Sequence, residues 1–64
     1  MLNNNLYNLM AQMVEESQSL WRIKNTYTQD ARNCGECVTF WNELAKDKEE
    51  HIKQLKELIK SHFD

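Results

Sequence analysis

The chain contains no proline and only one glycine, and these two residues are the strongest markers of turns between strands. Leucine, glutamate, lysine, glutamine and asparagine make up much of the rest, a composition that suits long helices. The sequence therefore predicts an all-α protein. At 64 residues it forms one domain at most, and a chain this short buries too little surface to be more than marginally stable by itself.

Three further absences exclude classes of protein. No apolar run approaches the ~20 residues that cross a bilayer, and the N-terminal MLNNNLYNLM lacks the basic start and the cleavage site of a signal peptide. The ten acidic and eight basic residues are interleaved, for a formal charge of −2, which argues against a nucleic-acid-binding protein. We therefore expect a cytoplasmic protein without membrane or nucleic-acid partners. Its expected partner is a second copy of itself, and any other protein partner is left open.

A row of apolar residues at spacings of three and four predicts a first helix from about residue 4 to residue 33. Asn3, Asn4 and Asn5 can accept hydrogen bonds from the free amides that open a helix, so the helix should begin among them. Gly35, with a positive φ, is expected to end it in a turn at 34–36. The row comprises Leu6, Leu9, Met13, Glu16, Leu20, Ile23 and Tyr27, with Asp30 and Cys34 as its continuation.

A second helix is predicted from about residue 36 to residue 61. Its apolar row is Trp41, Leu44, Leu55 and Leu58, with Lys48 and His51 in the middle of the row. The turn is too short for any but antiparallel packing, so we expect one helical hairpin over residues 1–64. A lone hairpin leaves one side of each apolar row in water, and two hairpins should therefore associate as a homodimeric four-helix bundle. The residues expected at the dimer interface are Leu6, Met10, Met13, Leu20, Trp21, Trp41, Leu44, Leu55 and Leu58.

Glu16 and His51 are the ionisable candidates for chemistry in the core. With the turn centred near Gly35, His51 should lie beside Leu20 and about one turn from Glu16. In a dimer, two copies of each would offer four oxygen and nitrogen ligands of the kind that zinc, iron or manganese accept. The competing interpretation is a core ion pair of Glu16 with Lys48, which needs no metal to explain either residue.

The segment FWNELAKDKEEHIKQLKELI resembles the second helix of the ferritin-like and rubrerythrin-like proteins, and LWRIKNTYTQDA resembles their first helix. The resemblance covers about residues 6–59, one hairpin or half of that family's four-helix domain. It implies a glutamate ligand seven residues before Tyr27 and another three before His51, but Leu20 and Lys48 occupy these positions. The resemblance therefore implies the ferritin-like fold and a dimer of hairpins without a family-type di-iron site.

Cys34 and Cys37 form a CxxC motif at the expected turn. Thiols at the start of a helix have their thiolates stabilised, and two of them at this spacing can form a redox disulfide or hold one side of a metal ion. A closed zinc or iron–sulfur site needs four ligands, twice what this motif supplies. The alternative is structural, with two small side chains that cap the turn and pack near Trp41.

These observations leave two hypotheses for the function. The first is a non-enzymatic, ferritin-like half-bundle that acts as a dimeric interaction or scaffolding protein. The second is a small metal-binding or thiol redox protein, which would use Glu16 and His51 in the bundle core or the Cys34–Cys37 pair at the turn. Neither a catalytic serine nor a phosphate-binding glycine loop is indicated, so an enzyme is the less favoured class.

Overall fold

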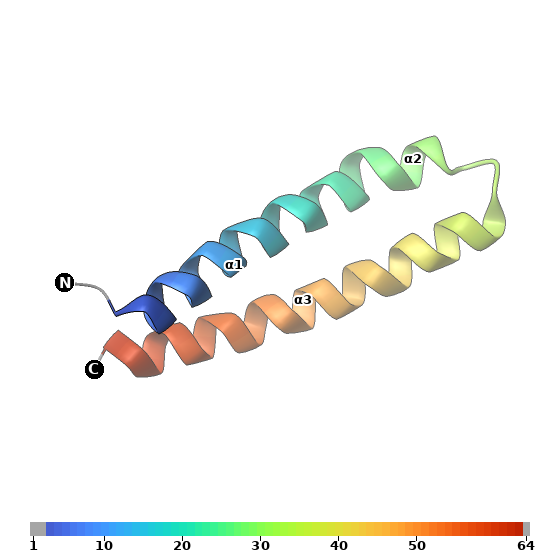
Figure 1. Cartoon of the computed structure of the whole chain (residues 1–64). Coiled ribbons are helices and arrows are strands. Elements are labelled where there is room, and N and C mark those ends of the chain that lie inside the picture. The colour runs from blue at the N-terminus through green and yellow to red at the C-terminus, as the bar shows by residue number, and fades with distance from the viewer. Residues whose placement is uncertain (1–2, 64) are drawn as a thin grey trace.

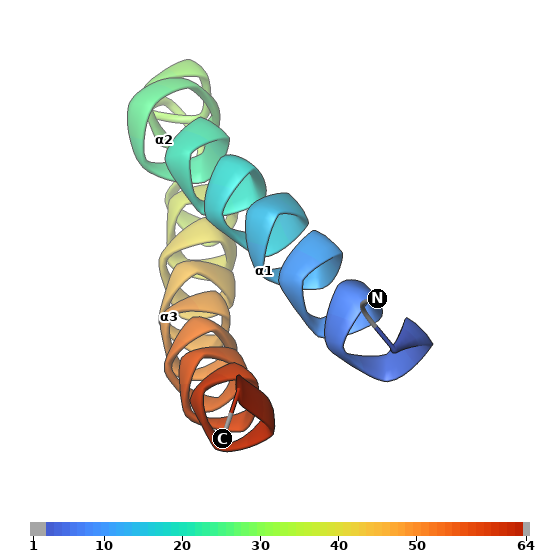
Figure 2. The same ribbon diagram turned by 90° about the vertical axis from the view of Figure 1, so that its left-hand side faces the viewer.

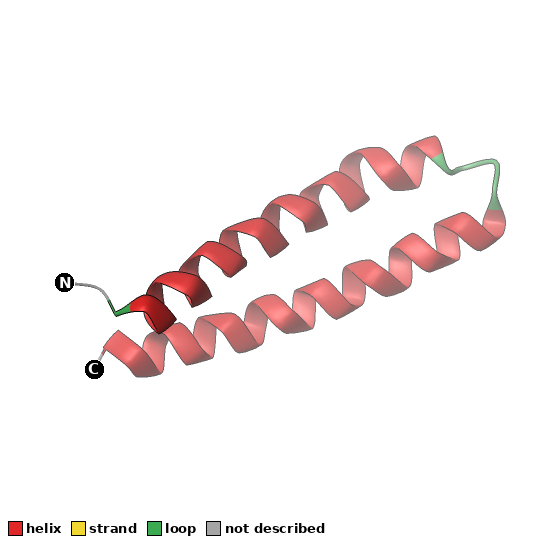
Figure 3. Ribbon diagram, in the orientation of Figure 1, coloured by secondary structure: helices red, strands yellow, loops and turns green. Residues whose placement is uncertain are grey.

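The computed structural model describes residues 3–63 and forms an antiparallel helical hairpin, which confirms the prediction of an all-α hairpin (Figure 1). Residues 1, 2 and 64 of the expected domain lie outside the described residues. The hairpin is long and thin, with extents of 49 × 16 × 13 Å. One short connection joins its two helical arms (Figure 3). The elements are α1 (Asn4–Arg22), η1 (Ile23–Tyr27), α2 (Thr28–Asp30) and α3 (Gly35–Phe63).

The first helix begins where the run of asparagines predicts. Asn3 has extended backbone angles, and its side-chain oxygen accepts a hydrogen bond from the Leu6 N–H at 2.7 Å. This bond satisfies one of the amides that a helix start leaves unpaired. Leu6 is itself buried, so the cap also fixes the position of a core side chain at the open end of the hairpin.

The first arm is interrupted by a π-helical segment, η1, that the sequence pattern does not predict. The Thr28 N–H donates to the Ile23 carbonyl five residues back, and Thr28 Oγ1 donates to the same carbonyl at 2.8 Å. A turn closed by such a bond contains one residue more than an α-helical turn. The inward row therefore moves by one position: Ala31 is half-buried, whereas Asp30, which the row placed inward, is exposed.

Gly35 does not end the first arm, contrary to the prediction. No described residue has a positive φ, and Gly35 is instead the first residue of α3. The helical backbone stops at Asp30, because Ala31 adopts φ −91° and ψ 5° and leaves the α region. The Cys34 N–H then donates to the Ala31 carbonyl at 2.8 Å and closes a tight turn. The turn is thus centred earlier than expected, and this shifts the register of the two arms.

On α3, the inward row differs in part from the predicted one. Ala45 and Ile59 are buried and Ile52 is half-buried, whereas His51 and Leu58, which the row placed inward, are exposed. A row that alternates spacings of three and four averages 3.5 residues per turn, and it drifts by ~20° per heptad against the α-helix. His51 and Leu58 therefore lie on one flank of α3.

The core is a thin seam between α3 and the first arm. Figure 2 shows α1 running obliquely to α3. Burying an aliphatic side chain contributes roughly 1.5–3 kcal/mol, and Ile23, 1% exposed, is the most completely enclosed of the described residues. The buried side chains within residues 3–63 are Leu6, Ile23, Ala45 and Ile59. So small a seam leaves the single hairpin only marginally stable.

Candidate functional site

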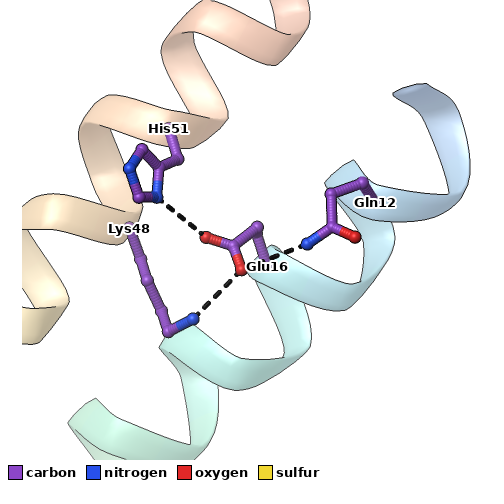
Figure 4. Close-up of polar contacts among 4 residues, drawn as sticks. All are labelled: Gln12, Glu16, Lys48 and His51. Carbon is purple, nitrogen blue, oxygen red and sulfur yellow. Dashed lines mark hydrogen bonds and ion pairs between the residues drawn. The ribbon is translucent and has the colours of Figure 1, made fainter. Parts of the chain in front are cut away.

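The polar cluster at the middle of the hairpin consists of Glu16 and the three side chains that bind its carboxylate (Figure 4). Lys48 Nζ lies 3.0 Å from Oε1 and His51 Nδ1 lies 3.2 Å from Oε2, both from α3. From α1, Gln12 Nε2 donates to Oε1 at 3.4 Å. The Glu16 and Lys48 side chains are 12% and 17% exposed, whereas His51 is 59% exposed. The structure thus brings together the three residues singled out in the sequence, with His51 at the rim.

The hydrogen bond from Lys48 holds the pKa of Glu16 below its usual value. Desolvation acts in the opposite direction and raises that pKa, while the hydrogen bond from His51 and the charge of Lys48 lower it further. The net result is a carboxylate that stays ionised to lower pH. Every buried polar side-chain atom in the described residues has a hydrogen-bond partner, so the cluster is satisfied within one chain.

His51 contacts Glu16 directly, whereas the expected register placed it beside Leu20 and about one turn from Glu16. The turn precedes Gly35, and the residue that Lys48 and His51 contact, Glu16, lies nearer the start of the chain than the expected register gives. The same shift brings Lys48, one turn before His51, onto the Glu16 carboxylate. The position of the turn therefore determines which groups meet in the middle of the hairpin.

As a metal site, the cluster offers one carboxylate and one imidazole per chain. Among residues 3–63, no group of three or more His, Cys, Asp or Glu side chains is placed to hold a metal ion. The Glu16 oxygens already bind Lys48 and His51, and the ammonium group of Lys48 repels a cation. A zinc, iron or manganese site at Glu16 and His51 would therefore require a second chain's copies and the release of Lys48.

At the second candidate site, Cys34 and Cys37 form a disulfide, with their Cα atoms 5.2 Å apart. Cys34 directly precedes α3 and caps it. Its carbonyl accepts the Val38 N–H at 3.0 Å, and its Sγ accepts the Cys37 N–H at 3.1 Å. The pair therefore caps the helix, as one interpretation of the motif requires, and its sulfurs are joined, as the redox interpretation requires.

Aromatic rings lie beside this disulfide. The Tyr27 and Trp41 rings have centroids 4.9 Å apart, and Phe40 packs edge-on against Trp41 at 5.2 Å. Cys37 is exposed and Cys34 is half-buried, so the two cysteines differ in access. An open recess next to the rings is lined by Tyr27, Asp30, Ala31, Cys37 and Trp41.

Large apolar side chains remain exposed on both arms. On the first arm, the α1 stripe recurs at helical spacing, and its Trp21 is 62% exposed. On the second arm, the α3 stripe runs along the flank that also carries His51. The α1 stripe is Tyr7, Met10, Val14 and Trp21. The α3 stripe is Phe40, Leu44, Leu55 and Leu58.

The two stripes lie on opposite faces of the hairpin. The α3 stripe borders an open groove lined by Gln12, Glu16, His51, Gln54, Leu55 and Leu58. The α1 stripe continues at helical spacing to Lys24, which binds Glu49 at 3.0 Å along a second groove. Glu49 and His51 are two residues apart on α3 and so point to different sides of the helix. The two grooves therefore open on different faces.

The residues expected at the dimer interface divide among the seam and the two stripes. Met10 and Trp21 are exposed on one face and Leu58 is exposed on the other, so one flat contact between two copies cannot cover all of them. Leu6 is buried within the hairpin, and Met13, Leu20, Trp41, Leu44 and Leu55 are half-buried.

Two contributors to these sites were not among the sequence candidates. Gln12 binds Glu16, and the spacing of four residues between them was a usable signal. Asp30 reaches the recess beside Cys37, but its position there follows from the π-helical segment, for which the sequence offered no signal.

No protein-family model, no curated protein and no solved structure matches this chain. The structure establishes an all-α, antiparallel two-helix hairpin. The comparisons assign this hairpin to no family. Over the part of the chain that the structure describes, none of the helices combines the length and the apolar composition needed to cross a membrane.

Proposed function

We propose that this chain is an interaction or scaffolding module that works as a homodimer of hairpins. Each chain would supply half of a ferritin-like four-helix bundle, and the family-type di-iron site is left out because Leu20 and Lys48 stand at its glutamate positions. The observation that carries the proposal is the apolar surface left in water. Within residues 3–63, seven large apolar side chains are exposed while four apolar residues are buried.

The dimer contact is assigned to the face with the Glu16 groove. Both arms border that groove, so a second hairpin laid on it would complete four helices. A twofold axis through His51 would set Leu44 against the partner's Leu58, because each lies seven residues from His51 along α3. This self-complementary pairing would cover the α3 stripe of both chains.

The α1 stripe would remain on the outside of such a dimer. Tyr7 and Trp21 are 61% and 62% exposed, and exposed aromatic side chains of this kind often supply most of the binding energy at protein interfaces. Their neighbours on α1 include the neutral residues Ala11, Ser17 and Gln18. The stripe is therefore suited to an apolar protein surface, and a dimer would present it twice, which is the arrangement a scaffold needs.

The test uses two lysine substitutions of matched exposure on opposite faces. Leu58 is 48% exposed on the α3 stripe, and Val14 is 52% exposed on the α1 stripe. Sedimentation equilibrium at micromolar concentration should give a dimer for the parent chain and for Val14→Lys. Leu58→Lys should dissociate, because each chain would bury a charge against apolar side chains.

A parent chain that sediments as a monomer and melts cooperatively at this dilution would contradict the dimer. Dissociation of Val14→Lys with retention of the Leu58→Lys dimer would contradict the assigned face. Circular dichroism of the parent chain over a dilution series gives the helix content of the dissociated state. If Leu58→Lys has the same helix content as the dissociated parent chain, the substitution has removed association alone. A lower helix content would mean that it has also unfolded the hairpin.

A further inference from the structure

The disulfide at the hairpin turn joins two sulfurs in unlike surroundings. Cys34 is half-buried and directly precedes α3, where its Sγ accepts the Cys37 N–H at 3.1 Å. Cys37 lies in the first turn of α3, is exposed, and lines the recess beside Tyr27 and Trp41. One sulfur is thus held at the free amides of a 29-residue helix, and the other belongs to an accessible residue.

This asymmetry determines which sulfur is attacked and which one leaves. In thiol–disulfide exchange, a thiolate attacks one sulfur, and the other sulfur departs as a thiolate. Amides at a helix start stabilise a thiolate, and one of them is already bonded to Cys34 Sγ. Asp30 lines the recess with Cys37, and its carboxylate disfavours a thiolate there. Cys34 is therefore the better leaving group, and Cys37 is the accessible target.

We propose that Cys34–Cys37 is a thiol–disulfide exchange site that oxidises a peptide dithiol. One thiolate of the dithiol attacks Cys37 Sγ, the bond between the two cysteines breaks, and its electron pair leaves on Cys34 Sγ. The second thiolate of the dithiol attacks the substrate sulfur of the mixed disulfide and releases Cys37. Two electrons pass from the dithiol to the cysteine pair. The two protons that the dithiol loses are taken up by the Cys34 and Cys37 thiolates.

The recess also determines the class of dithiol. Tyr27, Ala31 and Trp41 offer apolar contacts for the side chains next to a peptide cysteine. Asp30 in the recess and Glu36 between the two cysteines repel anionic thiols. The substrate is therefore a peptide of neutral or positive charge whose dithiol is flanked by apolar residues.

The first experiment identifies the attacked sulfur. The oxidised full-length protein is mixed briefly with a small amount of cysteamine, a cationic monothiol that forms a mixed disulfide but has no second thiol of its own to release the protein cysteine. Free thiols are then blocked with N-ethylmaleimide, and cleavage after Glu36 separates Cys34 from Cys37 for mass spectrometry. Cysteamine on Cys37 with maleimide on Cys34 should exceed the reverse pattern by at least about tenfold. A ratio near one, or the reverse pattern in excess, overturns the proposal.

The second experiment tests exchange with the proposed substrate class. A neutral peptide with two cysteines separated by two residues is mixed with the oxidised protein, and the disulfide formed in the peptide is followed by chromatography. An oxidised synthetic peptide of residues 31–39 serves as the reference in which no helix holds Cys34. The folded protein should oxidise the dithiol at least about tenfold faster, because the helix stabilises the leaving thiolate. Equal rates overturn the proposal.

Discussion

Replacing Lys48 with methionine removes the ammonium group from Glu16 and keeps a side chain of similar length in the seam. Glu16 is 12% exposed, so water can replace the lost hydrogen bond only in part. Hydrogen bonds to charged groups are worth about 1.5–3 kcal/mol, and His51 and Gln12 still bind the carboxylate. We therefore expect Lys48→Met to lower the free energy of unfolding by about 2 kcal/mol.

The control is Lys24→Met, which removes an ammonium group from Glu49. That pair has the same 3.0 Å separation between nitrogen and oxygen, but its side chains are 55% and 52% exposed. Exposed pairs contribute roughly 0.2–1 kcal/mol, so the control should lose less than half as much stability. Thermal unfolding followed by circular dichroism, at one fixed protein concentration, measures both variants. The loss at Lys48 corresponds to roughly 8–16 °C in Tm for a domain of this size.

Equal losses in Lys48→Met and Lys24→Met would refute this reasoning, because the larger loss at Lys48 is attributed to the burial of its pair. The double variant Glu16→Leu with Lys48→Met gives a second check. A seam without either charge leaves nothing unpaired, so the double variant should recover most of the stability that Lys48→Met loses. A double variant that loses the sum of the two single effects would show that the carboxylate and ammonium groups do not interact.

The same contacts predict the response to acid, to loss of the helix cap and to metal. Because the folded-state pKa of Glu16 is lowered, the stability from its ionised form is fully present above the ordinary glutamate pKa and is lost as pH falls through the lowered pKa. Urea titrations over a pH series should show that the free energy of unfolding falls less steeply with decreasing pH in Glu16→Gln than in the parent chain. An equal pH dependence in the two proteins would contradict this. Asn3→Ala should lower the free energy of unfolding by about 1 kcal/mol in thermal melts, whereas Asn4→Ala should leave it nearly unchanged. Equal effects of the two substitutions would mean that the Asn3 cap contributes nothing. Protein purified without chelator should carry far less than one iron, zinc or manganese ion per two chains by emission spectrometry, because Lys48 already binds Glu16. One ion per two chains that disappears in His51→Ala would contradict that expectation.

The hairpin itself could be predicted because its signals are local. A helix-favouring composition, capping asparagines and apolar residues at helical spacing specify two long helices joined by a short turn. Antiparallel packing then follows from the length of the turn. The meeting of Glu16 with Lys48 could also be foreseen, because both interrupt apolar rows near the middle of their helices.

The details that decide each site depend on backbone geometry that the pattern does not encode. The extra residue in the η1 turn moves Ala31 inward in place of Asp30. The turn begins at Ala31, and Gly35 keeps a negative φ as the first residue of α3. Each change moves the register by only a few residues. Together with the drift of the α3 row, they place His51 at the rim and onto Glu16.

The Glu16–Lys48 pair is better explained as a determinant of register than as a source of stability. Two apolar helices can slide by one turn, ~5.4 Å, and still bury similar side chains against each other. Such a slide would leave the Glu16 carboxylate and the Lys48 ammonium group in the seam without their partners, at a cost of several kcal/mol. The correct register is thus favoured mainly because the shifted ones are penalised. The same register brings Tyr27 to Trp41 beside the disulfide, so a charge pair at the middle of the hairpin also fixes the geometry of the site at its turn.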